Sequence, residues 1–131
     1  MKKITFICNK LARDKTIENM HQEGMNTQYK LLTNGELLPA LHNKLLEEAL
    51  EVTQAANRTE VVAELADVFE VIDAIKHFYA ITHEEIMAAK QTAYQARGGF
   101  QQGLFLESIA MDSTHRKVKY FRKSPDRYPE K

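Results

Sequence analysis

Two short segments constrain the fold of this chain most, because each mixes carboxylates with residues that usually form the core face of a helix. The first is KLLEEALEV (residues 44–52), and the second is ELADVFEVIDAI (residues 64–75). In both, Leu, Val, Ile and Ala recur at the spacing that places them on one side of a helix. The pattern predicts two amphipathic helices with acids on or beside the surfaces they bury.

The acids take matching positions in the two predicted helices. At about 100° per residue, Glu48 lies inside the apolar arc of its helix, and Glu51 lies about 60° away at the edge of that arc. Glu64 and Asp67 repeat this arrangement in the second helix, again about 60° apart. Because only the short turn ANRT (residues 56–59) joins the helices, we expect them to pack antiparallel with all four carboxylates at one seam.

Four carboxylates in a partly desolvated seam repel one another, and their pKa values rise unless a cation neutralises them. Oxygen ligands without Cys or His favour a hard cation, so the pattern predicts Mg²⁺, or else Mn²⁺, over Zn²⁺. A di-iron carboxylate bundle also gathers glutamates, but it needs Glu-x-x-His on two helices. This chain has that motif once, at Glu18 and His21, outside the acidic pair. A single glutamate of this kind would more often be a solvated position, since Glu is a good helix former.

Capping signals extend the acidic pair to three helices. Thr33, Asn57 and Thr82 are each followed three residues later by Glu, which predicts a helix start at each position. The first two helices should end near Asn57 and Tyr79, and the third at Gly98, where glycine suits the position after a helix. We therefore predict an all-α fold, a helical bundle built on the antiparallel acidic pair plus a third helix.

Other segments predict features around this bundle. Pro39 removes a backbone hydrogen bond from a helix, so the regular part of the first helix is expected to begin near it. Residues 2–8 and 29–33 have the character of two short N-terminal strands. We predict one domain over residues 1–110 and a polar, basic C-terminal tail over residues 111–131, which we interpret as mobile or loosely docked.

Composition restricts the partners and the compartment. Eighteen basic and eighteen acidic residues cancel, so we expect neither nucleic acid nor a membrane as a partner. No stretch approaches the roughly 20 apolar residues of a membrane helix, and the apolar run in MKKITFIC is too short for a signal peptide. The lone Cys8 cannot form an internal disulfide, which is typical of a reducing compartment. We expect a cytoplasmic protein.

The acidic segments also resemble a known family. EEALE (47–51) and ELAD (64–67), with twelve residues between them, are similar to E-E-x-x-E followed by E-x-x-D, the metal-binding signature of the all-α nucleoside triphosphate pyrophosphohydrolases. The chain resembles the MazG-like and phosphoribosyl-ATP pyrophosphohydrolase-like members of that superfamily. NKLARDK (9–15) and KQTAYQARGGFQQGLFLE (90–107) extend the resemblance over roughly residues 9–107.

The resemblance implies hydrolysis of a nucleoside triphosphate between its α- and β-phosphates, which gives a monophosphate and pyrophosphate. By position, it makes Glu48, Glu51, Glu64 and Asp67 the Mg²⁺ ligands, and Glu47 becomes a candidate for positioning the attacking water. It also implies a homo-oligomer, a dimer or tetramer whose sites borrow residues from a neighbouring chain. The wide apolar arcs of the acidic helices predict self-association as well, because a monomer would leave them in water.

A triphosphate substrate also needs cations. Lys90 and Arg97 lie seven residues apart and so share one face of the third predicted helix, and Arg13 and Lys15 come from the RDK segment. Arginine suits bidentate contacts to phosphate. Each would singly be an ordinary surface cation, but the resemblance makes all four candidate substrate ligands.

Two alternatives stay open beside this interpretation. The first is the phosphoribosyl-ATP pyrophosphohydrolase of histidine biosynthesis, which shares the chemistry but differs in substrate. The second is a helical interaction module that keeps the fold without catalysis. All four predicted metal ligands are present, which a decayed site would not require, and this favours an enzyme.

Overall fold

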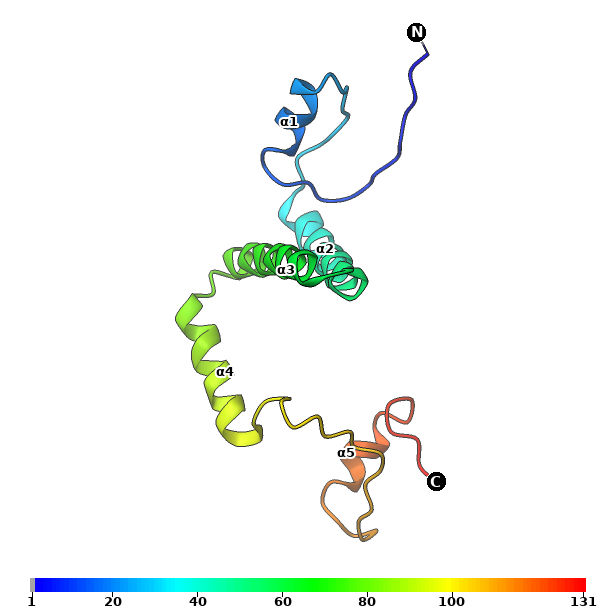
Figure 1. Cartoon of the computed structure of the whole chain (residues 1–131). Helices are drawn as coiled ribbons and strands as arrows, with labels where there is room; N and C mark the ends of the chain where they lie inside the picture. Colours follow the sequence, from blue (N-terminus) through cyan, green and yellow to red (C-terminus); the bar gives the residue numbers. More distant parts are fainter. Residues whose placement is uncertain (1) are drawn as a thin grey trace. The chain divides into compact units, whose positions relative to one another are not determined.

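The computed structural model describes residues 2–131, and within that range it is all-α, with no strand (Figure 1). Its helices are α1 (Thr16–Gln22), α2 (Asn34–Gln54), α3 (Arg58–Tyr79), α4 (His83–Arg97) and α5 (Val118–Arg122). The chain forms two compact units, Met1–Gln91 and Thr92–Lys131. The prediction of an all-α fold is confirmed, and the extent of a single domain over residues 1–110 stays a prediction.

The first acidic helix, α2, begins with a complete capping box. The Thr33 hydroxyl accepts a hydrogen bond from the Glu36 backbone N–H at 3.3 Å, and the Glu36 carboxylate accepts one from the Thr33 N–H at 3.2 Å. The predicted start near Pro39 is wrong, because α2 begins at Asn34 and includes Pro39. The capping box satisfies backbone N–H groups of the first turn, so the helix tolerates the loss of the one backbone hydrogen bond that the proline removes.

The starts of α3 and α4 agree with the predicted caps. The Asn57 side chain accepts a hydrogen bond from the Glu60 N–H at 2.9 Å. At α4, the Thr82 hydroxyl accepts from the Glu85 N–H at 3.1 Å, and the Glu85 carboxylate accepts from the Thr82 N–H at 2.7 Å. Gly98 follows the last residue of α4 with φ 75°, a conformation that costs glycine little because it has no Cβ.

The strands predicted for residues 2–8 and 29–33 do not form. Both segments lack regular secondary structure, and no backbone hydrogen bond among the described residues joins them. Apolar side chains in the first segment stay in solvent, with Phe6 82% exposed. A strand needs a partner strand to satisfy its backbone groups, and neither segment has one. Strand-like composition alone therefore does not make these segments form strands.

The two acidic helices pack against each other, as predicted, after the chain reverses between Gln54 and Arg58 (Figure 1). Leu41 and Val71 are the buried apolar residues of the described chain. Further apolar residues of the two helices are half-buried: Leu38, Leu45, Val52, Val61, Val68, Ile72 and Ile75. No described helix combines the length and apolar character needed to cross a membrane.

The second unit contains a short helix, α5, inside the segment that the sequence predicts to be a tail. The Arg122 guanidinium makes two hydrogen bonds to the Glu130 carboxylate, at 2.8 and 3.1 Å. The rings of Phe121 and Tyr128 stack edge to face with centroids 4.9 Å apart. These contacts fold the end of the chain back onto α5, and helical periodicity does not reveal them because Tyr128 and Glu130 lie beyond the end of the helix.

Candidate metal centre

Four carboxylates converge where α2 and α3 meet. Glu48 and Glu51 come from α2, and Glu64 and Asp67 come from α3. One oxygen of each lies within 4.8 Å of the chosen oxygens of the other three. The acids of each helix are three residues apart, which puts them on one face, and packing of the two faces completes the group that the sequence predicts. We call these four residues the carboxylate cluster.

Burial leaves part of the cluster without hydrogen-bond partners. Glu48 is 8% exposed, and the other three residues are half-buried. The Oε2 atoms of Glu48 and Glu64 are buried and accept no hydrogen bond. An orphaned acceptor of this kind is costly, whereas a cation among the carboxylates would satisfy it. Four oxygen donors without nitrogen or sulfur fit Mg²⁺ or Mn²⁺.

The cluster is short of positive charge. Burial raises the pKa of Glu48, and the neighbouring carboxylates of Glu51 and Asp67 raise it further, while Lys44 opposes them. Burial is also the largest cause that raises the pKa of Glu64, followed by Glu51 and Asp67. Both shifts have the direction expected of like charges that share a desolvated site.

Two lysines hold the adjacent Glu47, the predicted water-positioning residue. Lys10 Nζ lies 3.1 Å from Glu47 Oε1, and Lys44 Nζ lies 3.2 Å from Glu47 Oε2. Hydrogen bonding from Lys10 is the largest cause that lowers the pKa of Glu47, so this carboxylate stays ionised. Sequence reasoning missed both lysines. Lys44 could have been found from its i,i+3 and i,i+4 spacing to Glu47 and Glu48, whereas Lys10 is 37 residues away and left no such signal.

Arg13, one of the predicted substrate ligands, reaches the cluster. Its Nη2 atom donates a hydrogen bond to Asp67 Oδ1 at 2.9 Å. Both side chains are substantially exposed, so this ion pair contributes little to stability. The guanidinium retains further N–H donors, which could face a phosphate beside the cluster.

The three other predicted substrate ligands are not brought to the cluster by any contact within residues 2–131. Lys15 precedes α1, Lys90 lies on α4, and Arg97 is the last residue of α4. All three side chains are exposed, and none forms an ion pair or a hydrogen bond with a cluster residue. Arg97 belongs to the second compact unit. Their roles in binding substrate stay predictions.

Comparison with known proteins assigns the chain to no family. No family model matches it, and neither a curated protein nor a solved structure is significantly similar to it.

Proposed function

We propose that this protein is a divalent-metal-dependent nucleoside triphosphate pyrophosphohydrolase. The observation that supports this most is the convergence of four carboxylate oxygens within 4.8 Å, in a cluster where the Oε2 atoms of Glu48 and Glu64 are buried and unpartnered. Such a site is costly without a cation. Carboxylates that bind Mg²⁺ in proteins commonly share the ion with substrate phosphates, which agrees with the activity that the sequence resemblance implies.

Glu48, Glu51, Glu64 and Asp67 would hold the metal, Mg²⁺ or Mn²⁺. When bound, the ion would neutralise charge on phosphate oxygens and lower the pKa of a coordinated water. In the net reaction, water adds to the α-phosphorus and the bond to the bridging oxygen breaks. Pyrophosphate leaves, and the proton released from water passes to a base.

Residues beside the cluster would serve the substrate and the water. Lys10 and Lys44 keep Glu47 ionised, so its carboxylate can accept a hydrogen bond from water. Arg13 already lies 2.9 Å from Asp67, and it would donate hydrogen bonds to a phosphate, for which its planar group is well suited. Lys15, Lys90 and Arg97 remain the proposed additional phosphate ligands.

A substrate screen tests this proposal directly. The standard nucleoside triphosphates and phosphoribosyl-ATP would be incubated with the full chain and Mg²⁺, and the products separated by ion-exchange chromatography. We expect monophosphate and pyrophosphate in equal amounts from at least one substrate. Orthophosphate with a diphosphate as first products, or no turnover of any substrate, would contradict the proposal. Turnover confined to phosphoribosyl-ATP would select the histidine-pathway alternative.

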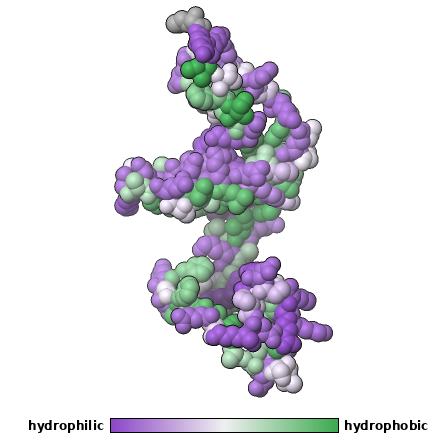
Figure 2. All heavy atoms as spheres, turned by 90° about the vertical axis from the view of Figure 1, so that its right-hand side faces the viewer, coloured by the Kyte–Doolittle hydropathy of each residue, from purple (hydrophilic) through white to green (hydrophobic). Residues whose placement is uncertain are grey.

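We also propose that the protein works as a homo-oligomer, a dimer or tetramer. Only Leu41 and Val71 of the described apolar residues are buried, although α2 and α3 are the two longest helices. Hydrophobic side chains remain at the surface beside hydrophilic ones (Figure 2). The large exposed ones on these two helices are Leu46, Leu50, Val62, Leu65, Phe69 and Tyr79.

A second copy of the helix pair would bury this surface in an isologous contact. Sedimentation at micromolar concentration checks the proposal, with an assembly of two or more chains as the expected result. A single species with the mass of one chain would exclude it.

A further inference from the structure

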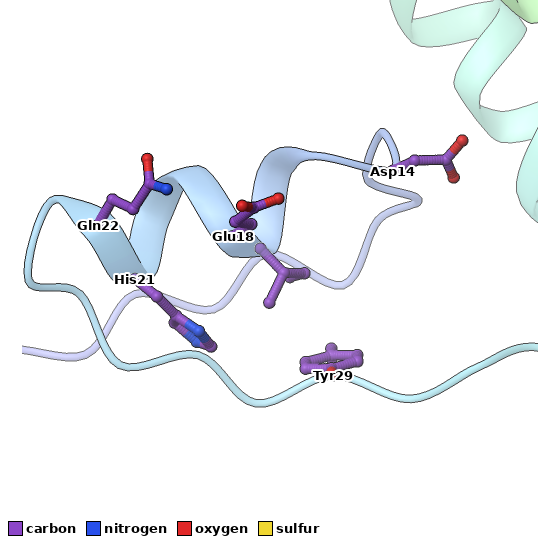
Figure 3. A pocket seen from close by; sticks show the side chains of 6 residues that line it. Asp14, Glu18, His21, Gln22 and Tyr29 are labelled. Atoms are coloured by element: carbon purple, nitrogen blue, oxygen red, sulfur yellow. The ribbon is translucent and has the colours of Figure 1, made fainter.

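An open hollow lies beside α1 in the first unit, apart from the carboxylate cluster (Figure 3). It measures about 540 Å³ and is lined by Asp14, Ile17, Glu18, His21, Gln22 and Tyr29. In Figure 3, Tyr29 lies on the segment that runs back along α1, and the His21 ring projects from the helix toward that segment. The hollow is large enough for one planar ring and its substituents.

Backbone and side-chain contacts hold the two sides of the hollow together. The His21 Nε2 atom is hydrogen-bonded to the Thr27 hydroxyl at 2.7 Å. The Met25 N–H donates to the carbonyl of Met20 at 3.0 Å, at the point where the chain leaves α1. Together they fix the returning segment against the helix, so the ring of Tyr29 has a defined place opposite α1.

The lining combines an apolar surface with unpaired carboxylates. Tyr29 is 64% exposed, which leaves an aromatic face available, and the half-buried Ile17 adds an apolar side chain to the lining. Glu18 and Asp14 form no ion pair with any residue of the described chain. A carboxylate accepts hydrogen bonds and donates none. The ligand that fits is therefore a flat ring whose edge carries N–H donors.

Among nucleobases, guanine meets this requirement best. Its N1–H and N2–H groups point the same way, so one carboxylate can accept both with its two oxygens. Adenine and cytosine offer an amino group without an adjacent ring N–H, and uracil offers a single ring N–H. Stacking on an aromatic side chain suits every base, so Tyr29 would supply affinity and Glu18 would supply the preference.

The hollow is connected to the carboxylate cluster through one pair of neighbouring residues. Asp14 lines the hollow, and Arg13, the residue before it, donates a hydrogen bond to Asp67 at 2.9 Å. Adjacent Cα atoms are about 3.8 Å apart, so the same short segment serves both places. A nucleotide also has two distinct ends, with its phosphates at one end, suited to the cluster, and its base at the other, suited to the hollow.

We infer that the hollow beside α1 binds the base of the triphosphate substrate and selects guanine, with Tyr29 stacking on the ring and Glu18 accepting its N–H donors. This inference rests on the proposed function, because it assigns a base site to the same substrate. It adds a residue-level basis for substrate choice that the carboxylate cluster alone does not contain.

Binding of analogues that cannot be cleaved tests the inference without requiring turnover. Calorimetric titrations with Mg²⁺ and the α,β-methylene analogues of GTP, ATP, CTP and UTP would be made on the full chain. We expect the GTP analogue to bind roughly 10-fold or more tightly than the UTP analogue. Tyr29→Ala should weaken all four by about 10-fold, and Tyr29→Phe, which keeps the ring, should restore the affinity.

Glu18→Gln tests the selection of guanine, because it replaces one acceptor oxygen with a donor. It should remove most of the preference for the GTP analogue. Glu23→Gln is the matched control, since Glu23 is also exposed at the end of α1 but does not line the hollow. It should change none of the four affinities.

The outcomes separate this inference from the proposed function. The base site is wrong, even in an active enzyme, if the analogues do not bind or if the UTP analogue binds as well as the GTP analogue. It is also wrong if Tyr29→Ala and Glu18→Gln both bind the analogues like the wild type. If the analogues bind with the expected preference but no triphosphate is hydrolysed, the hydrolase proposal fails and the base site stands.

Discussion

Glu36, at the N-terminus of α2, and the carboxylate cluster have opposite electrostatic surroundings, although Glu48 and Glu51 of the cluster lie on the same helix. At the N-terminus, Glu36 Oε2 is 2.8 Å from Lys30 Nζ, and its other oxygen accepts a hydrogen bond from the Thr33 N–H. These partners lower the pKa of Glu36 from 4.5 to about 2. In the cluster, burial and neighbouring acids raise the pKa values of Glu48 and Glu64.

The difference separates a carboxylate that stabilises a helix end from carboxylates that could hold a cation. Glu36 satisfies the first turn of a helix, a role that needs only residues close in sequence. The cluster instead holds Glu48 Oε2 and Glu64 Oε2 without partners. Natural proteins keep unfavourable groups of this kind mainly where function requires them. The contrast can be tested by removing members of each group.

Replacing a carboxylate of the cluster should have the largest effect of the predicted changes, and the effect should be a loss of activity. Mutation of groups that only orient metal ligands commonly costs 10- to 100-fold, so Glu48→Gln or Asp67→Asn should lower Mg²⁺-dependent turnover by about 100-fold or more. Initial rates of pyrophosphate release measure this. Glu70→Gln is the control, because Glu70 is an exposed acid of α3 outside the cluster. Near-normal turnover in either cluster variant would show that the ligand assignment is wrong.

Binding of a divalent metal should offset the repulsion among the cluster carboxylates and so stabilise the folded protein. A ligand that binds only the folded protein, present at 100 times its Kd, stabilises it by about 2.7 kcal/mol. We expect Mg²⁺ to raise the free energy of unfolding in urea by an amount of this order, and Glu48→Gln to abolish most of the gain. Without divalent metal, Glu48→Gln should be slightly more stable than the wild type, because it relieves repulsion among the four clustered acids. Equal stability with Mg²⁺ and with EDTA would contradict a metal centre.

Removal of the α2 cap should have a smaller effect and should be confined to stability. Thr33→Ala deletes the hydroxyl that accepts the Glu36 N–H at 3.3 Å, and loss of such a cap typically costs about 1 kcal/mol. Urea denaturation would measure the change, with Thr33→Ser as the control that keeps the hydroxyl. The prediction fails if the serine variant loses as much stability as the alanine variant.

The dependence of stability on pH should be the subtlest difference between the two groups. Between pH 4.5 and the raised pKa of Glu48, the native metal-free protein binds more protons than the unfolded chain, so this residue makes stability rise as pH falls. Between pH 4.5 and about 2, the unfolded chain binds more protons at Glu36, so this residue makes stability fall as pH falls.

Chemical denaturation at a series of pH values, in EDTA, measures these two contributions. Glu48→Gln should flatten the slope above pH 4.5, and Glu36→Gln should flatten the slope below it. Mg²⁺ should reverse the upper slope, because the metal requires ionised carboxylates. If Glu48→Gln leaves the slope above pH 4.5 unchanged in EDTA, the raised pKa is not a property of the folded protein.

The sequence by itself determined the features that depend on residues within a few turns of helix. The caps at Thr33, Asn57 and Thr82 follow from pairs three residues apart, and all three helices begin where these pairs predict. The inward positions of Glu48 and Glu64 follow from helical periodicity in the same way. Pro39 misled the prediction of where α2 begins, because a capping box outweighs the loss of one backbone bond.

Only the tertiary structure decided the contacts that depend on the path of the chain outside the helices. Lys10 meets Glu47 across 37 residues, and Arg13 meets Asp67 across 54. No periodicity links such positions, because the segment before α1 is not helical and its direction is set by what it packs against. The same reason applies to Tyr29, whose place opposite α1 depends on the hydrogen bond between His21 and Thr27. It also applies to residues 2–8 and 29–33, which form no strands because neither segment has a partner strand.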